Sequence, residues 1–151
     1  MTTPDVTVRQ ATVADLSLLV PLFDAYRQFY RCPSDVEGAR RFLLQRFEHN
    51  QSVIFLAFDG ASAIGFVQLY PSFSSASMAR IFILNDLFVS PEARGRGAGS
   101  ALLQGAADYG RAVGAVRLAL STEITNTKAQ AVYERFGWKR DDVFYSYQLT
   151  L

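Results

Sequence analysis

The chain of 151 residues contains only one cysteine and one histidine. A single cysteine excludes an internal disulfide framework and a cysteine-cluster zinc site, and a single histidine removes most other metal chemistry. No apolar run reaches the length of about 18 residues that a membrane span needs. The N-terminus shows neither the basic patch nor the apolar stretch of a signal peptide. We therefore expect a cytoplasmic protein with no metal and no membrane partner.

Excess charge of either sign is also lacking, because 15 basic residues against 14 acidic ones leave a formal charge of +1. A protein that binds nucleic acid unaided usually carries a far larger basic excess, so we expect no nucleic-acid partner. Half of the residues are hydrophobic and 13% are aromatic, which is enough apolar material for a core. With no internal repeat and no long linker, residues 1–151 are predicted to form a single domain.

The order of strands and helices predicts a mixed α/β fold. Strands are expected at residues 6–10, 52–58, 63–70, 80–89, 116–120 and 143–151. Helices are expected after Thr12, after Ser34, and at residues 98–111 and 126–136. Strand 80–89, helix 98–111 and strand 116–120 form a unit that must be parallel and right-handed, whereas the earlier strands can form antiparallel hairpins.

Local signals predict the helix ends, the turns and the buried helix faces. Thr12 stands three residues before Asp15 as an N-cap, and Ser34 with Glu37 forms a capping box for the second helix. Asp59-Gly60 predicts a hairpin turn, and the Ser-rich residues 71–77 predict a loop. Helical spacing predicts these inward-facing positions: Leu16, Leu19, Phe23, Tyr26 and Tyr30 in the first helix, and Val36, Ala39, Leu43 and Phe47 in the second.

A glycine-rich turn between strand 80–89 and helix 98–111 is the main candidate for ligand binding. A helix N-terminus presents unpaired N–H groups and a partial positive charge, and glycines let a phosphate approach the backbone. Arg94 and Arg96 add guanidinium groups, which suit phosphate geometry. The segment lacks the lysine of a Walker loop, and Ser100 stands where a Rossmann fingerprint needs glycine. Arg-x-x-Gly-x-Gly is matched in full by Arg94, Gly97 and Gly99; a β-to-α turn without a ligand is the alternative.

This segment resembles the signature Gln/Arg-x-x-Gly-x-Gly/Ala of the GNAT superfamily, the acetyl-CoA-dependent N-acetyltransferases. The segment Asn126 to Trp138 resembles the next motif of that family, with an Asn, then an Ala, a Tyr-Glu pair, and a Gly followed by an aromatic residue. The resemblance covers about residues 80–140. It implies a GNAT-like three-layer arrangement, in which a twisted mixed sheet of about six or seven strands is flanked by four helices.

The resemblance also implies a binding site for acetyl-CoA as co-substrate. The cofactor-binding positions carried over are Leu87, Phe88 and Val89 for the pantetheine arm, Arg94, Gly95, Arg96, Gly97, Ala98, Gly99 and Ser100 around the pyrophosphate, and Asn126, Ala129 and Tyr133 on the following motif. A β-bulge at residues 87–89 would separate that strand from its neighbour. Tyr133 would face the thioester sulfur as general acid.

The implied reaction is direct acetyl transfer to a primary amine. Such an amine is mostly protonated at pH 7, and deprotonating it costs about 4.6 kcal/mol. Asp86 is the first candidate for the base and Glu123 the second. At reference pKa values, full proton transfer from the Tyr133 phenol to the CoA thiolate is uphill by about 2 kcal/mol. The alternative is that Tyr133 only donates a hydrogen bond to the thiolate. Cys32 and His49 are more typical of structural and surface positions than of a nucleophile–base pair.

The acceptor is expected to be a small-molecule amine, and polyamines, amino acids and aminoglycosides all stay open. By analogy with the fold, Tyr26, Phe29, Tyr30, the second helix and residues 70–78 should surround it. Asn85 replaces the acidic residue of some polyamine-acetylating relatives, which argues against a polyamine-type base. The alternatives are a protein lysine or N-terminal acetyltransferase and a catalytically inactive CoA-sensing module. Many relatives form dimers, so the resemblance implies a homodimer.

Overall fold

The computed structural model describes residues 5–151, in which the chain forms two compact units, Met1–Leu120 and Ser121–Leu151. The N-terminal unit holds all the strands of the described residues, in a five-stranded sheet with the order β1-β2-β3-β4-β5. The strands are β1 (Val6–Gln10), β2 (Val53–Asp59), β3 (Ser62–Ser74), β4 (Ala79–Val89) and β5 (Leu118–Ala119). The helices of this unit are α1 (Leu16–Phe29), α2 (Val36–Glu48) and α3 (Ala98–Ala112), with short 3₁₀ helices at Val13–Asp15 and Pro91–Ala93.

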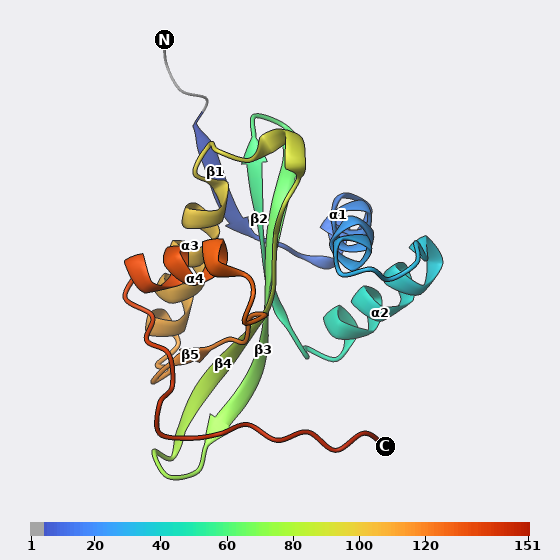
Figure 1. Ribbon diagram of the computed structural model, residues 1–151. Coiled ribbons are helices and arrows are strands. Elements are labelled where there is room, and N and C mark those ends of the chain that lie inside the picture. Colours follow the sequence, from blue (N-terminus) through green and yellow to red (C-terminus); the bar gives the residue numbers. More distant parts are fainter. Residues whose placement is uncertain (1–4) are drawn as a thin grey trace. The chain divides into compact units, whose positions relative to one another are not determined.

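The sheet has the mixed topology that the sequence predicts. Strands β1 to β4 pair as antiparallel neighbours, and the β2–β3 hairpin closes at the Asp59↔Ser62 pair, around the predicted Asp59-Gly60 turn. Strand β5 pairs with β4 in parallel after the α3 crossover, as a βαβ unit requires. In the N-terminal unit, α1 and α2 cover one face of the sheet and α3 covers the other (Figure 1), which gives the three predicted layers.

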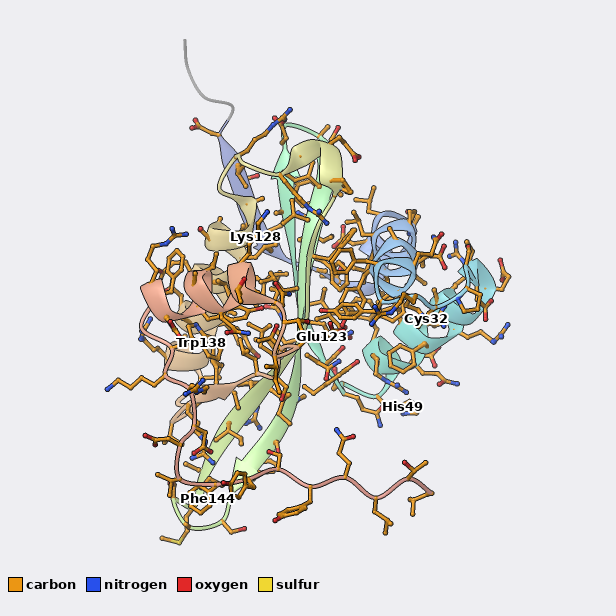
Figure 2. The ribbon with its side chains drawn as sticks, viewed as in Figure 1. Cys32, His49, Glu123, Lys128, Trp138 and Phe144 are labelled. Atoms are coloured by element: carbon orange, nitrogen blue, oxygen red, sulfur yellow. The ribbon has the colours of Figure 1, made fainter. Side chains whose placement is uncertain are left out.

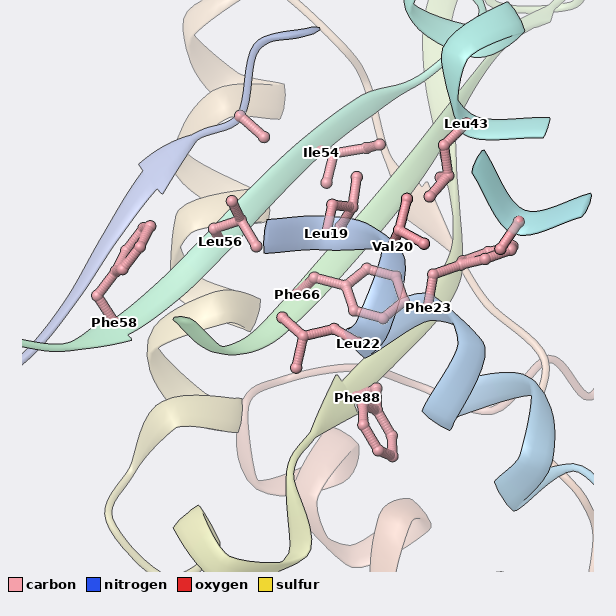
Figure 3. Packing of buried hydrophobic residues seen from close by; sticks show 12 residues of the cluster. Leu19, Val20, Leu22, Phe23, Leu43, Ile54, Leu56, Phe58, Phe66 and Phe88 are labelled. Atoms are coloured by element: carbon pink, nitrogen blue, oxygen red, sulfur yellow. The ribbon is translucent and has the colours of Figure 1, made fainter. Parts of the chain in front are cut away.

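The larger hydrophobic cluster lies between the sheet and the helices α1 and α2 (Figure 3). Leu19 and Leu43 from the predicted helix faces are fully buried there, together with Phe66 of β3. Burying one such side chain contributes roughly 1.5 to 3 kcal/mol. On the opposite face, the ring of Tyr109 on α3 packs against Phe55 and Phe82, with centroid distances of 5.6 and 5.5 Å. Both faces of the sheet are therefore buried by helices.

The first two helices begin differently from each other. As predicted, Thr12 is the N-cap of the 3₁₀ turn that leads into α1, and in this capping box the Asp15 carboxylate accepts a hydrogen bond from the Thr12 N–H at 2.9 Å. The predicted Ser34 cap is wrong: Asp35 caps α2 and accepts from the Gly38 N–H at 2.9 Å. The Ser34 hydroxyl instead donates to Asp24 at 2.7 Å. Because Asp24 is a buried carboxylate that needs donors, it engages Ser34, and the next residue caps the helix.

The structure also corrects one predicted loop and one predicted strand. Residues 71–74 belong to β3 and not to a loop, since the β3–β4 ladder continues to the Ser74↔Ala79 pair. The hydrogen bonds of this ladder satisfy backbone groups that would bond to water in a loop. Only Leu118–Ala119 of the predicted strand 116–120 is paired.

The sheet has fewer strands than the predicted six or seven, because residues 143–151 form no strand in the described structure. Alternating apolar residues form a strand only where a neighbouring strand supplies the ladder. At the start of this segment, the N–H groups of Val143 and Phe144 bond instead to the Asp141 side chain, at 2.9 and 3.0 Å. The C-terminal unit contains one helix, α4 (Thr127–Arg135), which completes the four predicted helices of the described residues. No helix in residues 5–151 has the length and apolar character needed to cross a membrane.

Candidate active site

The glycine turn leaves the start of α3 without a side-chain cap. Gly95 and Gly97 both have a φ of +83°, a backbone conformation that glycine adopts without strain. Gly97 is the N-cap residue and offers no side chain to the first N–H groups of the helix. A 15-residue helix thus begins with open backbone donors and the positive end of its dipole. This arrangement can bind an anion such as a phosphate.

Two arginines fix this turn to the rest of the N-terminal unit. The Arg94 Nε donates to the Val89 carbonyl at 3.1 Å, and its guanidinium lies over the rings of Phe29 and Phe88. Arg96 forms an ion pair with Asp59 at the β2–β3 turn. Both side chains are exposed, so these contacts hold the turn while the guanidinium groups still face solvent.

Strand β4 has a free edge just before the glycine turn. Its parallel ladder with β5 ends at the Ile83↔Ala119 pair, whereas its ladder with β3 continues to Val89. Residues 84–89, which include Leu87 and Phe88, therefore pair with β3 alone among the strands of the described structure. Backbone groups on the other edge are available to an extended ligand, in the manner of strand addition.

A β-bulge in β4 lies at Asn85 and not at the predicted residues 87–89. Gln68 pairs with Asp86 and Leu69 with Leu84, so Asn85 is the extra residue. A bulge reverses the alternation of side chains beyond it. Phe82 accordingly packs on α3, whereas Phe88 packs against Tyr26 of α1 at 6.3 Å, although both residues have even numbers. The bulge therefore turns Asp86 toward the face that α1 and α2 cover.

Asp86 is a buried carboxylate, with 2% of its surface exposed. It accepts hydrogen bonds from the side-chain amides of Gln68 and of Asn85, the latter at 2.9 Å. No cationic side chain of the described residues forms an ion pair with it. Burial raises the pKa of Asp86, and the bonds from Gln68, Asn85 and Tyr26 oppose that shift. A carboxylate in these surroundings is a stronger base than one in water.

Tyrosine side chains lie around Asp86. The Tyr26 hydroxyl donates to the backbone carbonyl of Asn85, next to Asp86, at 3.4 Å, and Tyr30 packs edge-on against Tyr26 at 5.0 Å. Burial raises the pKa values of Tyr26 and Tyr70 well above the ordinary phenol range, and the negative charge of Asp86 adds to both shifts. Both phenols therefore stay protonated and can donate hydrogen bonds. The aromatic residues predicted near the acceptor all belong to this cluster: Tyr26 and Tyr30 pack together, and Phe29 packs edge-on against Tyr30 at 5.3 Å and also lies under the Arg94 guanidinium.

The other predicted site residues lie in the C-terminal unit. The Asn126 side chain caps α4 by accepting from the Ala129 N–H at 3.2 Å. Tyr133 lies on the same helix, with its ring 6.0 Å from that of Trp138. The Glu123 carbonyl accepts from the backbone N–H of Asn126. The sequence motif is thus a capped helix that carries Tyr133 two turns after its start.

Gln68 and Arg46 are not among the site residues predicted from the sequence. Gln68 is fully buried within the apolar run of β3, and a polar residue in such a run is a signal for function that the sequence does contain. Arg46 lies near the end of α2 and lowers the pKa of Tyr70 against the larger effect of burial. No local pattern distinguishes Arg46 from the other arginines of that helix.

A pocket of about 590 Å³ lies on the opposite face of the sheet, where β1 and β2 meet α3. Its lining includes Phe55 and Tyr109 but none of the predicted site residues. Cys32 lies after α1 and His49 at the end of α2, outside both the surroundings of Asp86 and the pocket beside α3 (Figure 2). The structure therefore supplies no nucleophile–base pair from these two residues.

Comparison with known proteins agrees with this geometry. The family model described as the acetyltransferase (GNAT) family matches residues 19–138. An uncharacterized N-acetyltransferase of Bacillus subtilis, YhfO, is 50% identical over 144 residues, which are 95% of this chain and 97% of that protein. The crystal structure of a probable acetyltransferase has 44% identity and a TM-score of 0.92, covering 96% of this chain and 97% of the other.

A more distant structure has the same fold. The aminoglycoside N-acetyltransferase AAC(6')-Iy, solved in complex with CoA, has 19% identity and a TM-score of 0.80, covering 97% of this chain and 96% of the other. At this identity the likeness concerns the fold alone. The matched family model and the Bacillus relative, together with the uncapped glycine turn, establish that the chain belongs to the GNAT family of acetyltransferases and is an acyltransferase.

Proposed function

We propose that this protein transfers an acetyl group from acetyl-CoA to the primary amine of a small molecule, by direct attack in a ternary complex. One observation carries the proposal. The bulge at Asn85 places a buried carboxylate without a cationic partner, Asp86, on the strand that leads directly into the uncapped start of α3. A base and an anion-binding helix end are thus joined by one short segment.

Backbone groups of the N-terminal unit are suited to hold the donor. The N–H groups of residues 95–100 would bind the diphosphate of acetyl-CoA, with Arg94 and Arg96 at the rim. The free edge of Leu87, Phe88 and Val89 would pair with the amide groups of the pantetheine arm. Asn126 and Ala129, at the start of α4, would add contacts from the second motif. The CoA complex of a protein with the same fold supports this assignment.

Asp86 would accept the proton that the acceptor amine must lose. At pH 7 a primary amine is deprotonated at a cost of about 4.6 kcal/mol. The neutral nitrogen then attacks the thioester carbonyl, the C–N bond forms, the C–S bond breaks, and the second proton that the nitrogen loses goes to the CoA sulfur. The raised pKa of Asp86 favours its role as proton acceptor. Asn85 and Gln68 hold the carboxylate through hydrogen bonds while the proton moves.

Tyr133 would assist the departure of the CoA thiolate. A phenol hydrogen bond stabilises the developing charge, and full proton transfer is uphill by about 2 kcal/mol at reference pKa values. Tyr133 and Asp86 would thus act on opposite partners of the reaction, the leaving group and the nucleophile. We further propose that the protein acts as a homodimer in the cytoplasm on free small molecules.

The deciding experiment incubates the protein with acetyl-CoA and a panel of primary amines. Release of free CoA that depends on the amine, with the acetylated amine identified by mass spectrometry, is the expected result. Calorimetric binding of acetyl-CoA without turnover on any amine would instead indicate a CoA-sensing module. Acetylation of peptides but not of small amines would indicate a protein acetyltransferase.

A further inference from the structure

Three buried polar side-chain atoms of the described residues lack a hydrogen-bond partner, and all three belong to the surroundings of Tyr70. They are Gln68 Oε1, Arg46 Nε and Ser52 Oγ. Gln68 and Tyr70 alternate on the same face of β3. Ser52 directly precedes Val53, which pairs with Leu69, so the chain places Ser52 beside Tyr70. The Arg46 carbonyl accepts a hydrogen bond at 2.9 Å from the N–H of Gln51, which directly precedes Ser52, so Arg46 lies close to Ser52. Its positive charge also lowers the pKa of the Tyr70 phenol.

Such atoms are uncommon in folded proteins. Leaving one buried group unpaired costs about 1 to 3 kcal/mol, so three of them around one side chain call for a physical reason. A bound ligand that supplies the missing partners is such a reason. The three atoms differ in type: Gln68 Oε1 accepts, Arg46 Nε donates, and the Ser52 hydroxyl can do either. A matching ligand therefore carries both donors and acceptors.

Two charges of opposite sign act on Tyr70, one from Asp86 and one from Arg46. The negative charge of Asp86 raises the pKa of the Tyr70 phenol, and the positive charge of Arg46 lowers it, so both charges act on this one side chain. Asp86 and Gln68 together offer acceptors to an ammonium group. Arg46 and Ser52, with the protonated phenol of Tyr70, offer donors to an anion such as a carboxylate.

The geometry points to an amino acid as the acceptor, with its ammonium group at Asp86 and Gln68 and its carboxylate at Arg46 and Ser52. This inference rests on the proposed function and narrows its substrate class. The carboxylate is not consumed: Asp86 takes one proton from the ammonium group, the nitrogen forms a bond to the acetyl carbon, and the C–S bond of acetyl-CoA breaks. The second proton that the nitrogen loses goes to the CoA sulfur, and CoA leaves as the thiol. Arg46 is therefore a residue that determines specificity, and the base is Asp86.

The same arrangement disfavours two other classes of amine. A diamine or an aminoglycoside would bring a second cation toward the Arg46 guanidinium, and like charges repel. A simple amine would leave Arg46 Nε and Ser52 Oγ without partners. Sites built to hydrogen-bond a group on the substrate discriminate strongly against analogues that lack it.

The test compares each amino acid with the amine that differs only by lacking the carboxylate: lysine with cadaverine, ornithine with putrescine, β-alanine with ethylamine, and phenylalanine with phenethylamine. The expected result is a kcat/KM at least about tenfold higher for the carboxylate-bearing member of the best pair. The R46Q variant should lose most of that preference through a raised KM for the amino acid. It should change the rate with the matching amine by less than about threefold.

A matched control is R41Q, which removes the same charge from an exposed position of the same helix and should keep the preference. The S52A variant gives a second, smaller change at the carboxylate end, and thermal unfolding of each variant checks its fold. An equal or higher kcat/KM for the amines without a carboxylate in every pair would overturn the inference while leaving the proposed function in place. Failure of all amines would refute the proposed function itself.

Discussion

The D86N variant is the sharpest test of the proton acceptor. The amide has nearly the shape of the carboxylate but cannot take a proton at neutral pH. Gln68 and Asn85 donate to different oxygens of Asp86, so the single amide oxygen keeps one of these two hydrogen bonds. In the wild-type protein, the reactive pair is an ammonium substrate with ionised Asp86, which takes the first of the two protons that the nitrogen loses. The value of kcat/KM should therefore be constant between the pKa of Asp86 and that of the amine.

The variant needs an amine that has already lost its proton. Its kcat/KM should rise about tenfold per pH unit up to the amine pKa near 10.4, because the neutral fraction rises in that way. At pH 7 only about one amine molecule in 10³ is neutral. A positioned base typically raises the rate of a reaction by about 10²- to 10⁴-fold. We therefore expect a loss of about 10³-fold at pH 7, equivalent to about 4 kcal/mol, which narrows toward pH 10.

The assay is the loss of thioester ultraviolet absorbance with the best amine of the panel, measured across the pH range. The control is D24N, because Asp24 is also a buried carboxylate on the same side of the sheet but is bonded to Ser34 and to the Asp35 N–H. The control should keep the flat profile of the wild type. If D86N also keeps that profile, with a rate within about threefold of the wild type, Asp86 does not accept the proton.

The D86N variant should lose activity but gain thermodynamic stability at pH 7. Burial raises the folded-state pKa of Asp86 above the pKa of the same carboxyl in the unfolded chain, so the folded protein binds more protons than the unfolded chain between these two pKa values. The contribution of Asp86 to stability is thus most favourable below the unfolded pKa and declines as the pH rises to the folded pKa. At pH 7 we expect D86N to be more stable by about 1 kcal/mol in urea unfolding.

Three further predictions concern the donor site, the first helix and the leaving group. The G97A variant places a side chain at a φ of +83°, which costs about 1 to 2 kcal/mol of backbone strain. Calorimetry should therefore show weaker acetyl-CoA binding, and unchanged binding would exclude a role for this turn. The pKa of Asp15 is lowered to about 2, first by its hydrogen bond with Arg9. D15N should therefore lose about 1 kcal/mol at pH 7, and the difference from wild type should vanish as the pH falls from about 4 to 2; a difference independent of pH would contradict this. Y133F should lower kcat by about 10- to 100-fold with little change in KM, and a maximal rate unchanged across pH would exclude an essential acid.

Much of the proposed donor site can be read from the sequence because its determinants are local. Two glycines set the positive φ angles of the turn, and the same glycines leave the start of α3 uncapped. The α3 crossover and its parallel strand follow from chain order and handedness. Asn126 caps the second motif through its own neighbour three residues on. Each of these features depends on residues close together in the chain.

The surroundings of Asp86 could not be predicted in the same way. Alternation within residues 82–88 alone would place Asp86 on the face of Phe82, against α3. The bulge at Asn85 reverses this, and a bulge depends on how β3 and β4 pair along their whole length. The Ser34 cap was wrong for a similar reason, since Asp24, ten residues away, takes the Ser34 hydroxyl.

The sequence by itself determined the family, the order of the elements as far as α4 and the glycine turn before α3, because short-range backbone preferences and two motifs carry them. Only the tertiary structure decided which face Asp86 occupies and brought Gln68, Ser52 and Arg46 around Tyr70. These residues come from two strands, one helix and one loop, and their shared surroundings follow from strand register and helix packing. Such long-range contacts have no signature in the local pattern of residues.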